Sequence, residues 1–223
     1  MYLPPAFKID DLASLHAVMR SCPLATLVTK SGEQIVADPI PFLLDTACGD
    51  QGVLRGHVAR ANPLWQTHPA SAEVLVIFSG TNHYISPAWY PSKRETGKVV
   101  PTWNYAAVHA YGVLRVHDDP AWLRQQIDEL TACHEAGRAR PWAVSDAPEE
   151  FIAAQIKAIV GIEITITRLE GKLKASQNRA QSDREGVVAG LAASGSDQAR
   201  AMRDLVAQAM PAPRLRQAQP ERV

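Results

Sequence analysis

The chain has 223 residues, enough to bury a sizeable core, and its 46% hydrophobic and 21% charged residues are ordinary for a globular protein. Lys and Arg together number 23, as do Asp and Glu, so the formal net charge is zero. A zero net charge argues against a strongly basic nucleic-acid-binding protein, although it allows a local basic patch.

The three cysteines, Cys22, Cys48 and Cys133, are spread through the chain, and none belongs to a Cys-x-x-Cys pair. Their odd number and wide spacing argue against a disulfide framework or a structural zinc site, and they favour a reducing compartment, the cytoplasm. The N-terminal residues lack the basic and apolar stretches of a signal peptide. No apolar run approaches the length of a membrane span, so we expect no transmembrane helix and no membrane partner.

The first third of the chain predicts a short helix followed by a strand hairpin. Residues 10–19 begin with a capping aspartate and place their apolar side chains on one helical face. Residues 24–29 and 35–44 are strand-like and flank a Ser-Gly turn. Pro39 and Pro41 lack the backbone donor that a sheet needs, so the second strand should lie at a bulge or an edge.

Two further strands and a short helix follow. Residues 53–58 predict a third strand after a polar loop, and residues 62–68 predict one or two helical turns with Asn62 as the N-cap. Residues 73–79 predict a fourth strand, and their unbroken apolar run suggests burial on both faces. Residues 80–102 have no regular pattern but contain several aromatic residues, so we expect a long ordered loop.

The second half of the chain predicts one long strand, then helices, then a last strand. The fifth strand covers residues 104–117, and helices are predicted from Asp119 to Gly137 and from Pro148 to Gly161. Residues 162–167 alternate apolar and polar side chains, as a half-buried strand does. A basic, polar stretch at residues 172–184 follows that strand.

These elements predict an α+β fold, because the strands have short connections and the helices lie between strands or at the ends. We expect one domain over residues 1–195 and an amphipathic C-terminal helix over residues 196–210. Residues 211–223 are rich in Pro, Arg and Gln, and we expect this tail to be disordered.

The segment from His57 to Pro63 is the first candidate site, because a strand ends there and a helix begins. The first amides of a helix have no intrahelical partner and attract anions. Arg60 adds a planar set of donors that suits phosphate oxygens, and Asn62 lies beside it. The alternative is a surface arginine next to an ordinary helix cap.

Two more segments are rich in aromatic or donor groups. Trp103, Asn104 and Tyr105 offer flat rings and an amide that can read the edge of a heterocycle, unless the aromatics only pack beneath a loop. A later segment offers an ammonium, a hydroxyl and two amides within five residues, unless it is a solvated loop. The donors of that segment are Lys174, Ser176, Gln177 and Asn178.

The sequence lacks the common motifs of several other site types. It has no His-Glu-x-x-His metal motif, no Gly-x-Ser-x-Gly nucleophile elbow, no Gly-x-Gly-x-x-Gly loop and no Walker A loop. We therefore assign no metal ligand and no catalytic residue, and we leave open whether the protein is an enzyme.

Three segments taken together resemble the PaiB family of FMN-binding proteins, which are described as negative transcriptional regulators. They are GHVARANPLW at residues 56–65, the long aromatic segment at residues 78–105, and KLKASQNR at residues 172–179. The resemblance covers residues 1–210 in the same order. Ala175 departs from it, because the family is expected to have a bulkier apolar residue there.

The resemblance implies an antiparallel, Greek-key-like FMN-binding split β-barrel with peripheral helices, and a homodimer with the flavin at its interface. It also implies PaiB-type negative regulation of transcription, with an FMN-dependent oxidoreductase or flavin reductase as the alternative. The net charge gives no support to a direct DNA contact. The cofactor-binding residues implied in this way are His57, Val58, Arg60, Asn62, Trp103, Asn104, Tyr105, Lys174, Ser176, Gln177 and Asn178.

Overall fold

The computed structural model describes residues 1–68 and 72–210, and the chain divides into two compact units. The first unit contains residues 1–80 and 106–172, and the second contains residues 81–105 and the chain from residue 173 onward. The tail that we expect to be disordered lies outside the described residues. Three strands contain residues of both units.

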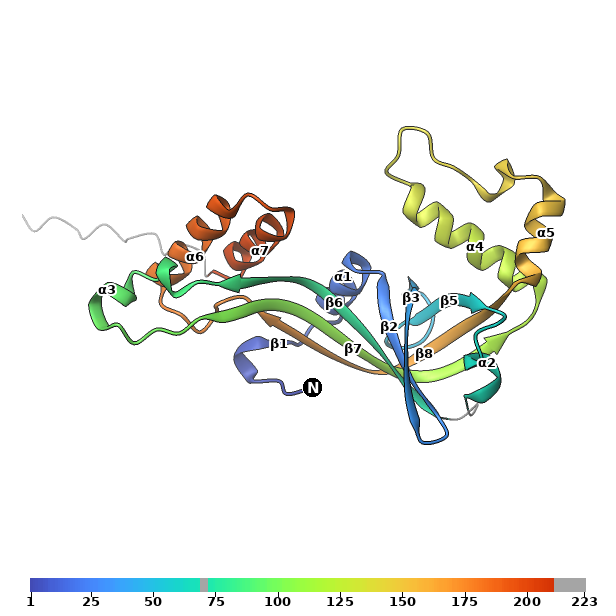
Figure 1. Cartoon of the computed structure of the whole chain (residues 1–223), viewed down its shortest axis with the longest axis horizontal. Helices are drawn as coiled ribbons and strands as arrows, with labels where there is room; N and C mark the ends of the chain where they lie inside the picture. Colours follow the sequence, from blue (N-terminus) through green and yellow to red (C-terminus); the bar gives the residue numbers. More distant parts are fainter. Residues whose placement is uncertain (69–71, 211–223) are drawn as a thin grey trace, which may run out of the picture. The chain divides into compact units, whose positions relative to one another are not determined.

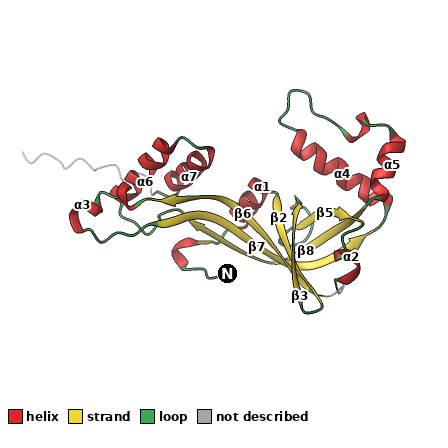
Figure 2. Ribbon diagram, in the orientation of Figure 1, coloured by secondary structure: helices red, strands yellow, loops and turns green. Residues whose placement is uncertain are grey.

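The strands form one antiparallel, eight-stranded sheet with the order β3-β2-β6-β7-β8-β5-β4, and β1 pairs with β8 (Figures 1 and 2). Within the described part of the chain no pairing joins β3 to β4, so the sheet is open. The predicted α+β class is confirmed. The strands are β1 (Lys8–Ile9), β2 (Leu24–Ser31), β3 (Gln34–Pro41), β4 (Leu43–Asp45), β5 (Val53–Ala59), β6 (Glu73–Ile85), β7 (Thr102–His117) and β8 (Ile159–Lys174).

Two of the longer helices begin at an aspartate whose side chain caps them. Asp11 accepts a hydrogen bond from the Ser14 amide at 2.7 Å, and Asp119 accepts one from the Trp122 amide at 3.0 Å, as expected of N-caps. The α-helices are α1 (Leu12–Ser21), α2 (Leu64–Thr67), α3 (Ser92–Thr96), α4 (Pro120–Glu135), α5 (Glu149–Lys157), α6 (Gln181–Ser194) and α7 (Asp197–Gln208). Three 3₁₀ turns are η1 (Pro5–Phe7), η2 (Pro87–Trp89) and η3 (Val144–Asp146).

The β2–β3 hairpin confirms the prediction made from its prolines. Pro39 lies opposite Thr26 and Pro41 lies opposite Leu24, and β3 is at the end of the strand order. The missing proline donors therefore leave no gap in the middle of the sheet.

Strand β6 corrects two predictions. Val74, Val76 and Phe78 are buried, but the residues between them are only half-buried, so the strand is not buried on both faces. The strand also continues to Ile85, so the loop predicted from residue 80 is wrong in its first part. Gly80 interrupts the apolar pattern, and a Cβ there would lie 3.2 Å from the Ala106 carbonyl oxygen, so glycine allows β7 to approach closely.

Strand β8 begins earlier and ends later than predicted. The sequence predicts that Gly161 ends a helix, but the helix ends at Lys157 and Gly161 lies inside the strand. A Cβ on Gly161 would lie 2.3 Å from the Trp122 ring, so this glycine makes room for a side chain of α4. The strand then extends to Lys174, into the segment predicted to be a polar stretch.

Helix α6 is the longest of the elements that the sequence analysis missed. Gly186 and Gly190 weaken its helical pattern, because glycine is a poor helix former. Both glycines face Trp89: a Cβ would lie 2.0 Å from the Trp89 carbonyl oxygen at Gly186 and 2.2 Å from the Trp89 ring at Gly190. The core of the second unit is made by Ile85, Tyr90, Ala175, Val187, Leu191, Ala199, Met202 and Val206.

Candidate functional site

The segment from His57 to Asn62 lies in the first unit, at the end of β5. Val58 is buried opposite Val160 of β8. The Asn62 side chain accepts a hydrogen bond from the Leu64 amide at 2.9 Å and donates one to Asp38 at 3.1 Å. The sequence predicts Asn62 as the N-cap of this helix, but the N-cap is Pro63, because the Asn62 side chain bonds within the turn that precedes α2, a helix of only four residues.

Arg60 is held by groups of its own chain. Its Nε donates to the Lys157 carbonyl at 2.8 Å, and one Nη donates to the Ile159 carbonyl at 3.0 Å. Both Nη atoms also donate to the Asp118 carboxylate, at 3.1 and 2.5 Å. The Arg60 hydrogen bond lowers the pKa of the Asp118 carboxyl below its ordinary value. Four of the five guanidinium donors are thus engaged, and an anion bound at Arg60 would share the guanidinium with Asp118.

His57 faces neighbours that the sequence analysis did not predict. Its Nδ1 donates to the Gln126 side-chain carbonyl at 2.8 Å. Its ring also lines an apolar pocket between α4 and α5. The first-unit candidates are therefore engaged mainly with protein groups.

Asn104 and Ser176 form a buried pair in the second unit. The Asn104 side chain is fully buried, and its Nδ2 donates to the Ser176 hydroxyl at 2.9 Å. Asn104 Oδ1 has no hydrogen-bond partner in the structure, which is unusual for a buried acceptor. Ser176 has a φ of 62°, a left-handed conformation that is uncommon for residues other than glycine. A ligand donor at this place would satisfy Asn104.

The residues around Ser176 are tied to the protein in different ways. Lys174 donates to the Thr102 hydroxyl. The Gln177 amide accepts from the Ala175 amide at 2.7 Å and donates to the Leu173 carbonyl at 2.6 Å, so it holds the turn of its own loop. Asn178 is exposed. The small Ala175, where the resemblance departs, is fully buried in the core of the second unit.

The aromatic candidates of the second unit divide into exposed and packed residues. Trp103 is 54% exposed and meets the Tyr84 ring edge-on, with centroids 6.0 Å apart. Tyr105 is half-buried. Tyr90 is buried in the core, and the Arg179 guanidinium lies 4.7 Å from its ring. Trp103 is therefore the predicted aromatic that remains most available to a ligand or partner.

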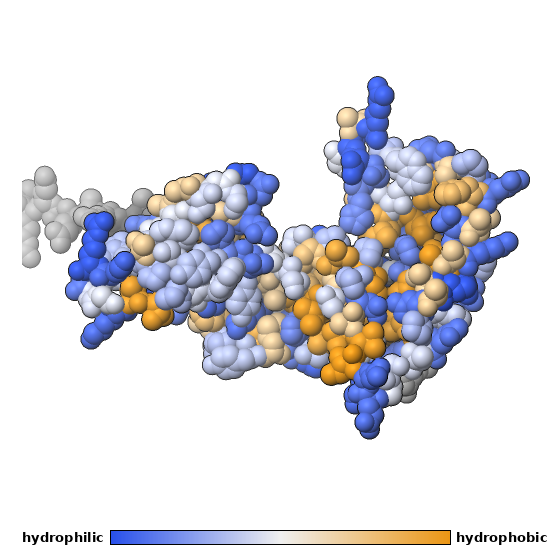
Figure 3. Space-filling view, viewed as in Figure 1, coloured by the Kyte–Doolittle hydropathy of each residue, from blue (hydrophilic) through white to orange (hydrophobic). Residues whose placement is uncertain are grey.

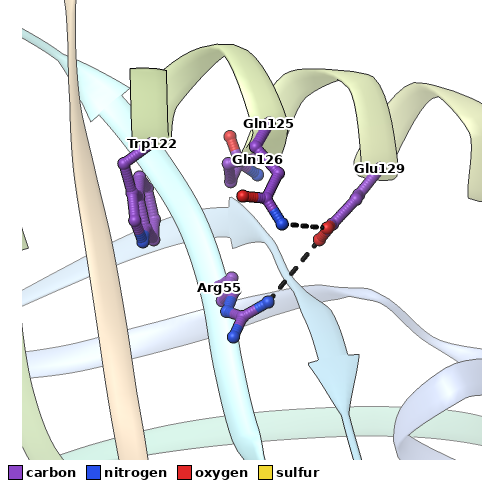
Figure 4. A pocket seen from close by; sticks show the side chains of 5 residues that line it. All are labelled: Arg55, Trp122, Gln125, Gln126 and Glu129. Atoms are coloured by element: carbon purple, nitrogen blue, oxygen red, sulfur yellow. Dashed lines mark hydrogen bonds and ion pairs between the residues drawn. The ribbon is translucent and has the colours of Figure 1, made fainter. Parts of the chain in front are cut away.

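A charged pocket around Arg55 was missed by the sequence analysis (Figure 4). Arg55 contacts three carboxylates, at 3.1 Å from Asp45, 3.3 Å from Glu163 and 3.6 Å from Glu129. These four residues are far apart in sequence, so no local motif marks them. Within the described ranges no group of His, Cys, Asp and Glu side chains forms a metal site.

Comparisons with known proteins identify the family. Residues 1–168 match the model of the family described as "Putative FMN-binding domain". The chain belongs to this FMN-binding family. A Bacillus subtilis protein named "Protease synthase and sporulation protein PAI 2" is 30% identical over 92% of this chain and 96% of its own length. This relative confirms the PaiB resemblance.

A fungal protein and a solved structure are also similar to this chain. "Uncharacterized protein AN0679" of Emericella nidulans is 39% identical to this FMN-binding chain over 92% of the chain and 96% of its own length. The solved structure of the FAD and heme binding protein from Mycobacterium smegmatis has a TM-score of 0.54 at 20% identity, covering 82% of this chain and 80% of that one. That likeness shows the fold, and the cofactor of the family is FMN.

Helices long and apolar enough to cross a membrane are absent from the described residues.

Proposed function

We propose that FMN binds at the buried Asn104–Ser176 pair and that the protein uses the bound flavin in PaiB-type negative regulation of transcription. The observation that carries the site is the unpartnered Asn104 Oδ1. Leaving a buried acceptor without a donor is costly, so such an atom is typical of a place that a ligand completes.

The donors and acceptors present fit the isoalloxazine ring. Its pyrimidine edge has one N–H between two carbonyl oxygens, so Asn104 Oδ1 suits the N–H, while the donors Lys174 and Asn178 suit the carbonyls or the phosphate. Bound flavin supplies the redox chemistry, and the protein positions it. Gln177 positions the loop and does not contact the flavin, because its side-chain amide is hydrogen-bonded to the loop backbone.

We keep His57, Val58, Arg60 and Asn62 as the proposed phosphate segment on the strength of the family membership. Arg60 then works as a shared donor, with its position set by Asp118 and the Lys157 carbonyl. Arg60→Lys keeps the charge but loses the planar geometry. The variant should weaken FMN binding about tenfold and leave riboflavin binding unchanged, because riboflavin lacks the phosphate.

We also propose a cytoplasmic homodimer. The three cysteines are free thiols, as in a reducing compartment. Exposed Trp103 and Tyr84 supply aromatic side chains of the kind that interfaces favour, whereas Tyr90 and Trp89 are used inside the second unit. Light scattering on the 24.3 kDa chain should report a dimer at micromolar concentration, and a monomer at that concentration would contradict the proposal.

The regulatory role is supported by the PaiB resemblance and by the distribution of charge. The second unit has 11 Lys and Arg against 6 Asp and Glu, and the first has 12 against 17, so the zero net charge conceals a basic unit. On α7, however, Arg200 and Arg203 pair with acidic neighbours. A DNA-binding assay with and without FMN tests this role. Steady oxidation of NADH or NADPH without DNA binding would instead favour the oxidoreductase.

The site is tested by replacing both members of the buried pair. Asn104→Leu combined with Ser176→Ala removes both polar partners together, so no unpaired group remains and the FMN-free protein should keep its stability. FMN affinity, followed by flavin fluorescence, should fall about tenfold, the scale of a lost hydrogen bond. Arg94→Ala, on the exposed surface of the same unit, is the control. Unchanged FMN affinity in the double variant would show that FMN does not bind at this pair.

A further inference from the structure

An apolar pocket in the first unit shares only His57 with the residues of the proposed flavin site. It lies between α4, α5 and the segment around η3, and its volume is about 230 Å³. Hydrophobic residues show at the surface of this part of the first unit in Figure 3. Seven of the lining side chains are apolar and come from all three elements or the turns beside them: Ile127, Leu130, Trp142, Val144, Ala147, Phe151 and Ile152.

The pocket is open at a rim of two aromatic rings. Trp142 is 48% exposed and Phe151 is 56% exposed, while Val144 and Ile152 are buried in a small core that joins α4 to α5. The walls are therefore fixed by packing, and the rim is free to contact an incoming molecule. An apolar cavity of about 150 Å³ is large enough to hold benzene. This pocket has room for a single ring with a substituent.

His57, Thr131 and Gln155 are the polar residues that line this mainly apolar pocket. The His57 Nδ1 lies 2.8 Å from the Gln126 side-chain carbonyl, which can only accept, so this hydrogen bond places a proton on Nδ1. Nε2 then has a free lone pair, and no partner for it exists among the described residues. Gln126 is almost fully buried, so it holds the imidazole ring in one orientation. The pocket thus offers a mainly apolar volume in which His57 supplies an acceptor of fixed orientation.

We propose that this pocket binds a small aromatic molecule that carries a hydroxyl group, and that the hydroxyl donates a hydrogen bond to His57 Nε2. The ring packs against Ile127, Leu130 and Phe151. FMN, with three fused rings and a phosphate chain, is too large for the pocket, so the ligand is a separate one. The inference does not depend on Asn104 or on the regulatory role.

The proposal is tested with two probes that differ only in the hydroxyl group. We expect 4-methylphenol to bind the wild-type protein in isothermal titration calorimetry, and toluene to bind about tenfold more weakly, the scale of one hydrogen bond. In His57→Phe, which keeps a ring but removes the acceptor, the two probes should bind equally. Ala147→Phe, which places a ring at the pocket wall, should abolish the binding of both, and Arg94→Ala should change neither.

The same titrations contain the results that would overturn the proposal. Equal affinities of the two probes for the wild-type protein would mean that His57 Nε2 makes no contact, and no binding of either would mean that the pocket is not a ligand site. The titration is repeated with the protein saturated with FMN. Unchanged affinity is expected, and loss of 4-methylphenol binding would place this pocket within the flavin site.

Discussion

Gly186→Ala offers a direct test of how α6 is held in the second unit. At an open helical position this change stabilises a protein by about 1 kcal/mol, because alanine is the better helix former. Here the new Cβ would lie 2.0 Å from the Trp89 carbonyl oxygen, a distance at which the backbone must shift. Because a backbone atom cannot rotate aside, we expect the upper part of the overpacking cost, about 3 kcal/mol.

The two effects leave a net loss of about 2 kcal/mol in the free energy of unfolding. Urea denaturation of the FMN-free protein, followed by far-UV circular dichroism, measures it. Ala189→Gly, at an exposed position of the same helix, isolates the propensity term and should cost about 1 kcal/mol. A Gly186→Ala protein as stable as the wild type, or more stable, would show that α6 does not pack against Trp89 in this way.

Two further predictions concern loops and charges. Gln177→Ala should lower the unfolding free energy of the FMN-free protein by about 1–3 kcal/mol in the same urea assay, because it removes two hydrogen bonds of the loop. If stability is not lost, the Gln177 amide serves only a ligand. Arg60 lowers the pKa of Asp118 below its ordinary 3.8, so the stability from this pair is complete above that pH and is lost as the pH falls through the lower folded-state value. Acid unfolding should therefore show this loss in the wild type and not in Asp118→Asn, and identical profiles would contradict it.

Local signals were sufficient to predict the elements that depend on neighbouring residues. The caps at Asp11 and Asp119 and the edge position of Pro39 follow from side-chain chemistry within a few residues. Several of the errors occurred at glycines. Gly80 and Gly161 resemble interruptions in the sequence, but each makes room for a group distant in the chain. Such close approaches depend on tertiary packing, which a single sequence does not contain.

The same distinction applies to the candidate site. The sequence indicated Asn104 and Ser176 as separate candidate residues. Their hydrogen bond joins residues 72 positions apart, so it could not be predicted from local sequence. The acceptors that hold Arg60 are also distant in the chain. The Gln177 amide turned toward its own loop, although donor density alone suggested a ligand contact. The family resemblance predicted FMN as the ligand of these residues, which their spacing in the sequence did not.

Flavin titration tests most directly whether this chain binds FMN through both its ring and its phosphate. The FMN-free protein is titrated with FMN and with riboflavin, and the quenching of flavin fluorescence gives both affinities. We expect FMN to bind at least about tenfold more tightly than riboflavin, because the phosphate adds a charge-assisted hydrogen bond. Equal affinities for FMN and riboflavin would show that the protein does not contact the phosphate. If neither flavin binds, the proposal that this chain uses FMN is contradicted.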